Sequence, residues 1–376
     1  MPFSPDELLR YQRHLGLAGF GPDAQEKLRA GSVLVVGAGG LGCPALLYLA
    51  AAGVGRVVLL DSDTVDVSNL QRQILYGTAD AGRPKALAAA ERLRALNPHV
   101  AVDARPERLT RDNALALVRS VDVVLDGSDN FATRYLVNDA CVLAGRPFVY
   151  GAIQGFEGQV SVFNHRDGPT YRCLFPEPPP PGAAPNCAEA GVLGVLPGLV
   201  GALQATETIK LLAGIGEPLS GRLLLFDALS MSTRTLRLAA SPAARSITGL
   251  PPEGYGDTCR VSPASPPAEA SPPDEISPDA LRAALASSAP PQLLDVREDW
   301  ERALGALSPS AHIPLAALPS ADLSALDPSL PLVVYCAGGV RSAKALPLLR
   351  ARAPFTELRS LRGGFKAWVS SAPAAG

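Results

Sequence analysis

The chain has 376 residues, 47% of them hydrophobic, and a formal net charge of −2, which allows two domains with their own cores and gives no reason to expect nucleic-acid binding. It contains no run of about 18 uncharged apolar residues and no basic N-terminal region followed by an apolar segment, so neither a membrane span nor a signal peptide is expected. Its six scattered cysteines do not resemble a secreted disulfide framework, and we expect a cytoplasmic protein.

The first part of the chain alternates strand-like apolar runs with helix-like stretches. The predicted strands are Val33–Val36, Arg56–Leu60, Val121–Leu125, Phe148–Tyr150 and Gln159–Phe163. The predicted helices are Asp6–Leu15, Leu41–Ala52, Lys85–Leu96 and Asn130–Ala144. This alternation predicts an α/β fold built on a doubly wound, mainly parallel sheet.

A glycine-rich turn, Gly37-Ala38-Gly39-Gly40-Leu41-Gly42, separates the first predicted strand from the helix that follows it. Glycines at these spacings let the backbone approach a phosphate at the helix N-terminus. Asp61 ends the next strand, where an acidic residue binds ribose hydroxyls. The pattern predicts a nucleotide site that includes Gly37, Gly39, Gly40, Gly42 and Asp61. An NAD site and a purely structural glycine turn are the alternatives.

Two cations follow this turn, Arg72 within Ser68–Gln73 and Lys85 at the start of the next helix. A dinucleotide has no evident need for them, whereas a triphosphate needs cations around its β- and γ-phosphates. The pair therefore favours ATP over NAD. Taken singly, each of the two could instead be a solvated surface charge.

A third polar segment, Asp126-Gly127-Ser128-Asp129-Asn130, follows another apolar run. Ligands bind at the carboxyl ends of strands in such sheets, and a carboxylate there can hold Mg²⁺. We expect Asp129 to be that ligand. The alternative is that Asp129 caps the next helix.

Proline dominates residues 262–273, which can sustain neither a helix nor a central strand. We expect a front domain at 1–261, a semi-rigid linker at 262–273 and a smaller α/β domain at 274–376. The predicted strands of the smaller domain are Gln292–Val296, Leu332–Cys336 and Leu358–Leu361.

A cysteine loop, Cys-Ala-Gly-Gly-Val-Arg at 336–341, follows the second of these strands and precedes a helix-like stretch from Ser342. Free backbone amides, Arg341 and a helix N-terminus together stabilise an anion. The arrangement predicts that Cys336 is a reactive thiolate.

Six motifs of the front part occur in a familiar order: Arg10–His14, Gly37–Gly42, Ser68–Gln73, Gly82–Lys85, Asp126–Asn130 and Asn186–Val192. Over roughly residues 4–260 the chain resembles the adenylyltransferases of the MoeB/ThiF type, which are relatives of ubiquitin-activating enzymes. The resemblance implies a substrate, a small ubiquitin-fold sulfur-carrier protein ending in Gly-Gly. Its C-terminal carboxylate would attack the α-phosphate of ATP, giving an acyl-adenylate and pyrophosphate.

The resemblance also assigns roles to matching positions. Gly40 and Asp61 would line the adenosine site, Asp129 would bind Mg²⁺, and Arg13 would reach into the partner's site of a homodimer. The phosphates would be held by Asn69, Arg72 and Lys85. Neighbouring positions of the same motifs are assigned to the nucleotide site as well: Ser68, Leu70, Gln71 and Asn130.

Two cysteines of the front part match family positions. Cys187 would attack the adenylate or take part in an acyl-disulfide, although a buried, inert cysteine is the alternative. Cys173 matches one ligand of the structural zinc site that the family usually forms with two Cys-x-x-Cys pairs. The second pair would fall within Ser241–Arg245, which has no cysteine. Because tetrahedral zinc needs about four ligands, we predict no zinc.

Residues 276–373 resemble a rhodanese (sulfurtransferase) domain through Leu293–Glu298, Tyr335–Ser342 and Leu361–Trp368. The resemblance implies a persulfide on Cys336, held by the loop amides and Arg341, with a cysteine desulfurase or thiosulfate as sulfur donor. A structural role for Arg341 and an inactive rhodanese fold are the alternatives. Asp295 and Arg297 are expected to brace the fold.

Together the two resemblances predict ATP-dependent activation of a carrier's C-terminal glycine, followed by sulfur transfer that leaves a thiocarboxylate. Such a product would serve molybdenum-cofactor, thiamine, cysteine or tRNA-thiolation pathways. Three rivals remain at this level: an activator for protein conjugation through a Cys187 thioester, an NAD-dependent oxidoreductase fused to a sulfur-handling domain, and a non-enzymatic scaffold.

Overall fold

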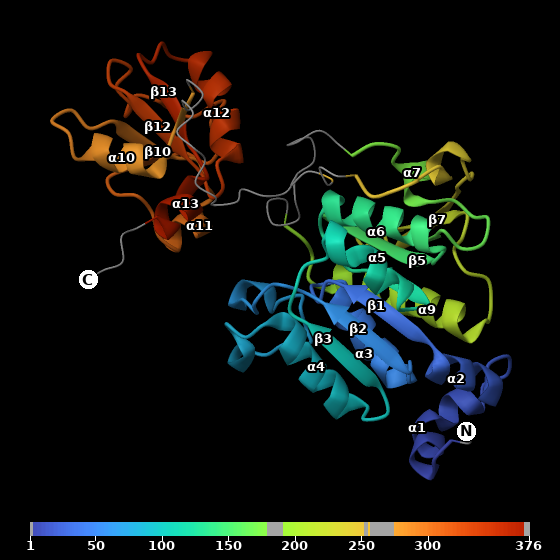
Figure 1. Cartoon of the computed structure of the whole chain (residues 1–376). Coiled ribbons are helices and arrows are strands. Elements are labelled where there is room, and N and C mark those ends of the chain that lie inside the picture. The colour runs from blue at the N-terminus through green and yellow to red at the C-terminus, as the bar shows by residue number, and fades with distance from the viewer. Residues whose placement is uncertain (1–2, 179–190, 252–254, 256–273, 372–376) are drawn as a thin grey trace. The chain divides into compact units, whose positions relative to one another are not determined.

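A computed structural model gives the fold of the chain and describes residues 3–178, 191–251, 255 and 274–371. The chain forms two compact units, Met1–Arg260 and Val261–Gly376. Cys187 and the proline-rich segment 262–273 lie outside the described residues. Figure 1 shows the helices and strands of both units.

An eight-stranded sheet organises the described part of the first unit, in the order β3-β2-β1-β4-β5-β6-β7-β8. Five strands run parallel: β1 (Ser32–Val36), β2 (Arg56–Leu60), β3 (Ala101–Arg105), β4 (Val123–Asp126) and β5 (Phe148–Gln154). Three antiparallel strands extend it: β6 (Glu157–Phe163), β7 (Arg222–Asp227) and β8 (Ser232–Arg237). The predicted mainly parallel, doubly wound sheet is confirmed.

Helices cover both faces of this sheet. They are α1 (Pro5–Leu15), α2 (Gly21–Ala30), α3 (Gly42–Ala52), α4 (Lys85–Leu96), α5 (Arg111–Arg119), α6 (Phe131–Ala144), α7 (Tyr171–Leu174) and α9 (Val195–Ala213). Alternate residues of β1 face opposite ways. Val33 and Val35 pack in a core with α2, α3, α4 and α9, whereas Leu34 and Val36 pack in another with α5 and α6. Burial of β1 on both faces explains its unbroken apolar sequence.

A smaller parallel sheet, in the order β11-β10-β12-β13-β9, organises the second unit. Its strands are β9 (Glu275–Ile276), β10 (Gln292–Asp295), β11 (Ala311–His312), β12 (Leu332–Tyr335) and β13 (Leu358–Leu361). Its helices are α10 (Pro278–Leu285), α11 (Asp299–Ala303), α12 (Val340–Arg350) and α13 (Gly364–Ser370). Val334 packs with α12 on one face, and Val333 packs with α10 and α13 on the other. The predicted smaller α/β domain is confirmed.

Candidate functional site

A cavity of about 800 Å³ opens at the carboxyl ends of β1, β2 and β4 in the first unit. The chain order reverses there, because β1 lies between β2 and β4 in the sheet. Such a switch point is where ligands bind in open α/β sheets. Predicted site residues that line the cavity are Gly37, Gly39, Gly40, Asp61, Arg72, Lys85, Asp129 and Asn130.

The glycine turn lies against the N-terminus of α3. Gly42 does not line the cavity, but a Cβ on it would lie 2.0 Å from the Gly37 carbonyl oxygen. Only glycine fits at this close approach. Gly42 therefore holds the turn against the helix, while its neighbours face the cavity.

Asp61 is fixed by the turn that it faces. One carboxylate oxygen accepts from the Ala38 amide at 2.7 Å, and the other accepts from the Asp63 amide at 2.8 Å. Burial raises the pKa of Asp61 despite these hydrogen bonds. The carboxylate is thus pre-oriented at the cavity wall, where it can accept from ribose hydroxyls.

The two predicted cations come from separate segments. Lys85, which is buried, begins α4, and its Nζ lies 3.4 Å from Asp63 Oδ2. Arg72 donates to the Ser68 carbonyl at 3.4 Å. Both line the cavity, so they can act on one bound anion. Sequence reasoning missed Asp63, whose position two residues after Asp61 was the available signal.

Asp129 and Asn130 end the loop after β4. The cap of α6 is Asn130, whose Oδ1 accepts from the Thr133 amide at 2.9 Å. The alternative interpretation of Asp129 as the helix cap is therefore wrong. Asp129 lines the cavity and leaves its carboxylate available to a cation.

Several predicted residues lie away from the described cavity lining. Ser68 and Asn69 belong to a short 3₁₀ helix, Val67–Asn69, in which Asn69 Nδ2 donates to Ser68 Oγ at 3.2 Å. Leu70 and Gln71 follow it, and Arg13 lies exposed in the last turn of α1. None of these five residues lines the cavity.

Arg134, a buried cavity-lining residue, was missed by sequence reasoning. Its Nε lies 3.8 Å from Asp126 Oδ2, and one terminal nitrogen donates to the Ser128 carbonyl at 3.2 Å. Burial raises the pKa of Asp126, which is fully buried. The signal would have been the position of Arg134, one helical turn after Asn130.

The second unit carries the thiol. Cys336 follows β12 and is 1% exposed, and its Sγ accepts from the Gly339 amide at 3.1 Å. Ser342 Oγ lies 3.5 Å from the same sulfur. Helix α12 begins at Val340, two residues before the predicted Ser342. An amide, a hydroxyl and a helix N-terminus thus surround the Cys336 sulfur.

Arg341 points to a carboxylate from another helix. Its two terminal nitrogens donate to the two oxygens of Glu301 in α11, each at 2.6 Å. Glu301 was not identified from the sequence, since 40 residues separate the partners.

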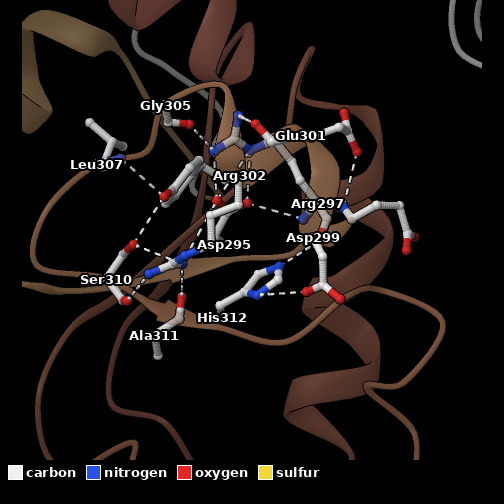
Figure 2. Close-up of polar contacts among 12 residues, drawn as sticks. Asp295, Arg297, Asp299, Glu301, Arg302, Gly305, Leu307, Ser310, Ala311 and His312 are labelled. Carbon is white, nitrogen blue, oxygen red and sulfur yellow. Dashed lines mark hydrogen bonds and ion pairs between the residues drawn. The ribbon is translucent and has the colours of Figure 1, made fainter.

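A buried brace supports this end of the second sheet (Figure 2). Arg297 Nη2 donates to Asp295 Oδ2 at 2.7 Å, and Arg302 Nη1 lies 3.9 Å from the same oxygen. His312 Nε2 lies 2.8 Å from the Arg297 carbonyl oxygen. These contacts tie β10, β11 and α11 together, which suits a structural role for Asp295 and Arg297.

Cys173 lies at a polar contact between two segments of the first unit. Its Sγ accepts from the Thr170 and Ser241 amides, both at 3.3 Å. Of the residues described, no group of three or more His, Cys, Asp or Glu side chains is placed to hold a metal. One thiol with backbone amides does not match a tetrahedral zinc site.

Comparison with known proteins gives the family. The model of the ThiF family matches residues 11–246, and that of the rhodanese-like domain matches residues 277–371. A probable adenylyltransferase/sulfurtransferase, MoeZ of Mycobacterium tuberculosis, is 47% identical over 97% of this chain and 94% of its own. The adenylyltransferase and sulfurtransferase MOCS3 of Mus musculus is 45% identical over 98% and 86%.

A shorter relative and a solved structure match the first part alone. The sulfur carrier protein adenylyltransferase of Thermus thermophilus is 59% identical over 64% of this chain and 91% of its own. E. coli MccB has a TM-score of 0.57 at 22% identity, covering 64% of this chain and 74% of that one, and shows a shared fold. Within the described residues, no helix has the length and apolarity to cross a membrane. The chain belongs to the ThiF family, among the ATP-using adenylyltransferases that carry a C-terminal rhodanese-like sulfurtransferase domain.

Proposed function

We propose that this enzyme adenylates the C-terminal glycine of a ubiquitin-like sulfur-carrier protein and then transfers sulfur to it from Cys336. The observation that carries the proposal is the pairing, in one chain, of a cation-lined nucleotide cavity with a buried cysteine loop. The names of the relatives support the same two activities. The six scattered cysteines favour a cytoplasmic enzyme.

In the first step a carrier carboxylate attacks the α-phosphate of ATP and pyrophosphate leaves. We assign the adenosine to Gly40 and Asp61, and the phosphates to Arg72 and Lys85, with Asn69 closing on them. Cations placed before the reaction stabilise the charge that develops on the phosphates. Asp129 would hold Mg²⁺, which would neutralise further phosphate charge.

A second copy of the chain would complete the site. Arg13 is exposed at the end of α1 and does not line the cavity of its own chain. We propose a homodimer in which each Arg13 reaches the nucleotide of its partner.

In the second step the terminal sulfur of a Cys336 persulfide attacks the acyl-adenylate carbonyl, and AMP leaves. Attack of Cys187, our candidate thiol, on the Cys336 sulfur of the resulting acyl-disulfide would release the thiocarboxylate and leave a Cys187–Cys336 disulfide, which a thiol reductant would then open. The sulfur donor would be a cysteine desulfurase or thiosulfate. The proposed linker, residues 262–273 between domains at 1–261 and 274–376, would let Cys336 visit the adenylate.

We propose that no zinc supports the fold. One contact joins the two segments that zinc would have linked, because Thr170 Oγ1 donates to the Ala244 carbonyl at 3.3 Å. Arg172 is held from α6 instead, where it pairs with Asp139 at 2.8 Å. Tyr255 donates to Asp139 at 2.6 Å. Metal analysis of the purified chain tests this directly, because stoichiometric zinc would contradict it.

The test of the function is ATP–pyrophosphate exchange with candidate Gly-Gly carriers, followed by mass spectrometry of the carrier after a sulfur donor is added. We expect carrier-dependent exchange, then the mass increase for one oxygen replaced by sulfur. Absence of carrier-dependent exchange with every candidate would refute the first step. A thiocarboxylate formed by the Cys336→Ala variant would refute the second.

A further inference from the structure

The cation of the cysteine loop is held by a carboxylate. Arg341 lies five residues after Cys336, and its guanidinium makes a two-pronged ion pair with Glu301 at 2.6 Å for each prong. Planar, bidentate pairs of this kind are the strongest and most directional between side chains. Since Glu301 belongs to α11 and Arg341 to α12, the pair fixes the guanidinium from outside its own loop.

Glu301 is itself held in place. Its Oε2 accepts from the Glu298 amide at 3.0 Å, and its carbonyl accepts from Arg297 at 3.2 Å. Figure 2 shows the Glu301 carboxylate turned away from the Asp295 brace. Burial works to raise the pKa of Glu301, but the hydrogen bonds from Arg341 and the Glu298 amide outweigh it and leave that pKa lowered. At neutral pH the residue is therefore a fixed anion.

Carboxylates offset the positive charge of Arg341. Arg341 interacts electrostatically with Glu301, Glu298 and Cys336. Two carboxylates thus act on one guanidinium before the thiolate is counted. The adjoining brace adds Arg297 and Arg302, which face Asp295, while Asp299 lies 3.5 Å from His312. Among the described residues of this pair and the brace, three guanidinium groups meet four carboxylates, while the exposed cations Arg362 and Lys366 lie on the segment whose backbone packs against Cys336 and Ala337.

We propose that Glu301 is a positioning residue that determines donor specificity: by holding Arg341 and cancelling its charge, it disfavours thiosulfate and favours a protein-bound persulfide. The inference rests on the proposed role of Cys336 as sulfur carrier. It reduces the candidate sulfur donors from two classes, thiosulfate and a protein-bound persulfide, to the persulfide.

The two donors deliver the same atom with different charge. With thiosulfate, the Cys336 thiolate attacks the outer sulfur, a new S–S bond forms, and the old one breaks with its electron pair on sulfite. With a persulfide, R–S–SH, the thiolate attacks the outer sulfur and R–S⁻ leaves. The first encounter joins an anion to a dianion, whereas the second joins an anion to a group that carries at most one negative charge. In a partly buried site this difference is weakly screened.

Two small donors that differ by one negative charge, thiosulfate and methanethiosulfonate, test the effect of the donor's charge. Methanethiosulfonate transfers its outer sulfur to a thiolate as thiosulfate does, with sulfinate as leaving group, but it carries one negative charge fewer. We would measure kcat/KM for persulfide formation on Cys336 with both donors, in the full chain and in Glu301→Gln. Glutamine keeps the shape of Glu301 and can still accept from the Glu298 amide.

We expect Glu301→Gln to raise kcat/KM for thiosulfate about tenfold, mainly through KM, and to raise it for methanethiosulfonate only about threefold, because the lost charge acts half as strongly on a monoanion as on a dianion. Glu357→Gln is the matched control. It removes one negative charge paired with Arg359 at the amino end of β13, whereas Cys336 follows the carboxyl end of the parallel strand β12. It should change neither donor. An equal response of both donors to Glu301→Gln would overturn the proposal.

A second measurement needs no variant. In the unaltered enzyme, raising the ionic strength from about 0.05 M to about 0.5 M should increase kcat/KM for thiosulfate, because salt screens like charges. A decrease would show a net positive loop and refute the proposal. Failure of both donors to load Cys336 at all would instead refute the sulfur-carrier role on which the inference rests.

Discussion

The nucleotide loop and the cysteine loop have the same local arrangement of strand, loop and helix in two separate units. Each follows a parallel strand, β1 or β12, and precedes a helix, α3 or α12. Each is also closed by a glycine: a Cβ on Gly42 would lie 2.0 Å from the Gly37 oxygen, and one on Gly364 would lie 2.3 Å from the Cys336 oxygen. Backbone amides at a helix N-terminus, packed without room for a side chain, can hold an anion in either place.

The two loops differ in whether a buried carboxylate pairs with their cations. At the nucleotide loop, Lys85 is buried while its partner Asp63 is 62% exposed, and within the described part of the chain no carboxylate pairs with Arg72. At the cysteine loop, Arg341 is matched by a largely buried Glu301. The first arrangement keeps positive charge for a polyphosphate. The second cancels it, which suits a sulfur atom passed between proteins.

Removing the thiol gives the largest expected effect. We expect Cys336→Ser to lower carrier thiocarboxylate formation by at least about a thousandfold, as loss of a nucleophile does. Carrier-dependent ATP–pyrophosphate exchange should stay within about twofold of the unaltered enzyme, because the nucleotide cavity is in the other unit. A parallel loss of exchange would show that the two loops do not act separately.

Removing a nucleotide-site cation should have the opposite effect, a loss of pyrophosphate exchange without a loss of Cys336 loading. We expect Lys85→Ala to reduce pyrophosphate exchange about a hundredfold or more, since a fixed cation at the phosphates is lost. Loading of Cys336 from methanethiosulfonate should be unchanged. Lys27→Ala, an exposed lysine outside the cavity lining, is the matched control. Normal exchange in Lys85→Ala would remove Lys85 from the proposed site.

The two closing glycines give a matched pair of packing tests. Alanine at Gly42 would meet the Gly37 carbonyl oxygen of its own turn, and alanine at Gly364, the first residue of α13, would meet the Cys336 carbonyl oxygen. We expect each change to destabilise its unit by about 3 kcal/mol, at the upper end for overpacking. Gly42→Ala should impair ATP binding and Gly364→Ala should impair Cys336 loading. Gly198→Ala, where a Cβ would meet nothing within 4 Å, is the control. Both sites could be measured by chemical unfolding and by the two partial reactions.

The sequence predicted the parts of both loops that are local. Strand, glycine turn and helix are adjacent in the chain, so β1 with α3 and β12 with α12 could be recognised from spacing alone. β8 could not, because all six of its residues are exposed and its sequence lacks an apolar pattern. It exists because its backbone pairs with β7, which the sequence of Ser232–Arg237 does not encode.

The carboxylates that pair with the site cations were also not identified from the sequence. Asp63 reaches Lys85 over 22 positions and Glu301 reaches Arg341 over 40. Asp63 offered as a signal only its position two residues after Asp61, and Glu301 offered none, so only the fold shows which cation each acid pairs with. The sequence therefore identified the groups that carry charge, and the structure was needed to say which of those charges are cancelled.

The smallest expected effect is a pH dependence of stability that belongs to the cysteine-loop unit. Because the pKa of Glu301 is lowered from its ordinary value of 4.5, its ion pair adds stability that is present above that pH and is lost as the pH falls through the lowered value. Both tryptophans, Trp300 and Trp368, belong to this unit, so fluorescence-detected unfolding of the full chain reports on it alone.

Glu301→Gln should lower the free energy of unfolding of this unit by about 1 kcal/mol at neutral pH. It should also flatten the loss of stability below pH 4.5. Asp61 of the nucleotide loop shows the opposite direction, since burial raises its pKa. An unchanged slope in Glu301→Gln would mean that the Glu301–Arg341 pair does not persist in solution, and the contrast between the two loops would then lose its electrostatic basis.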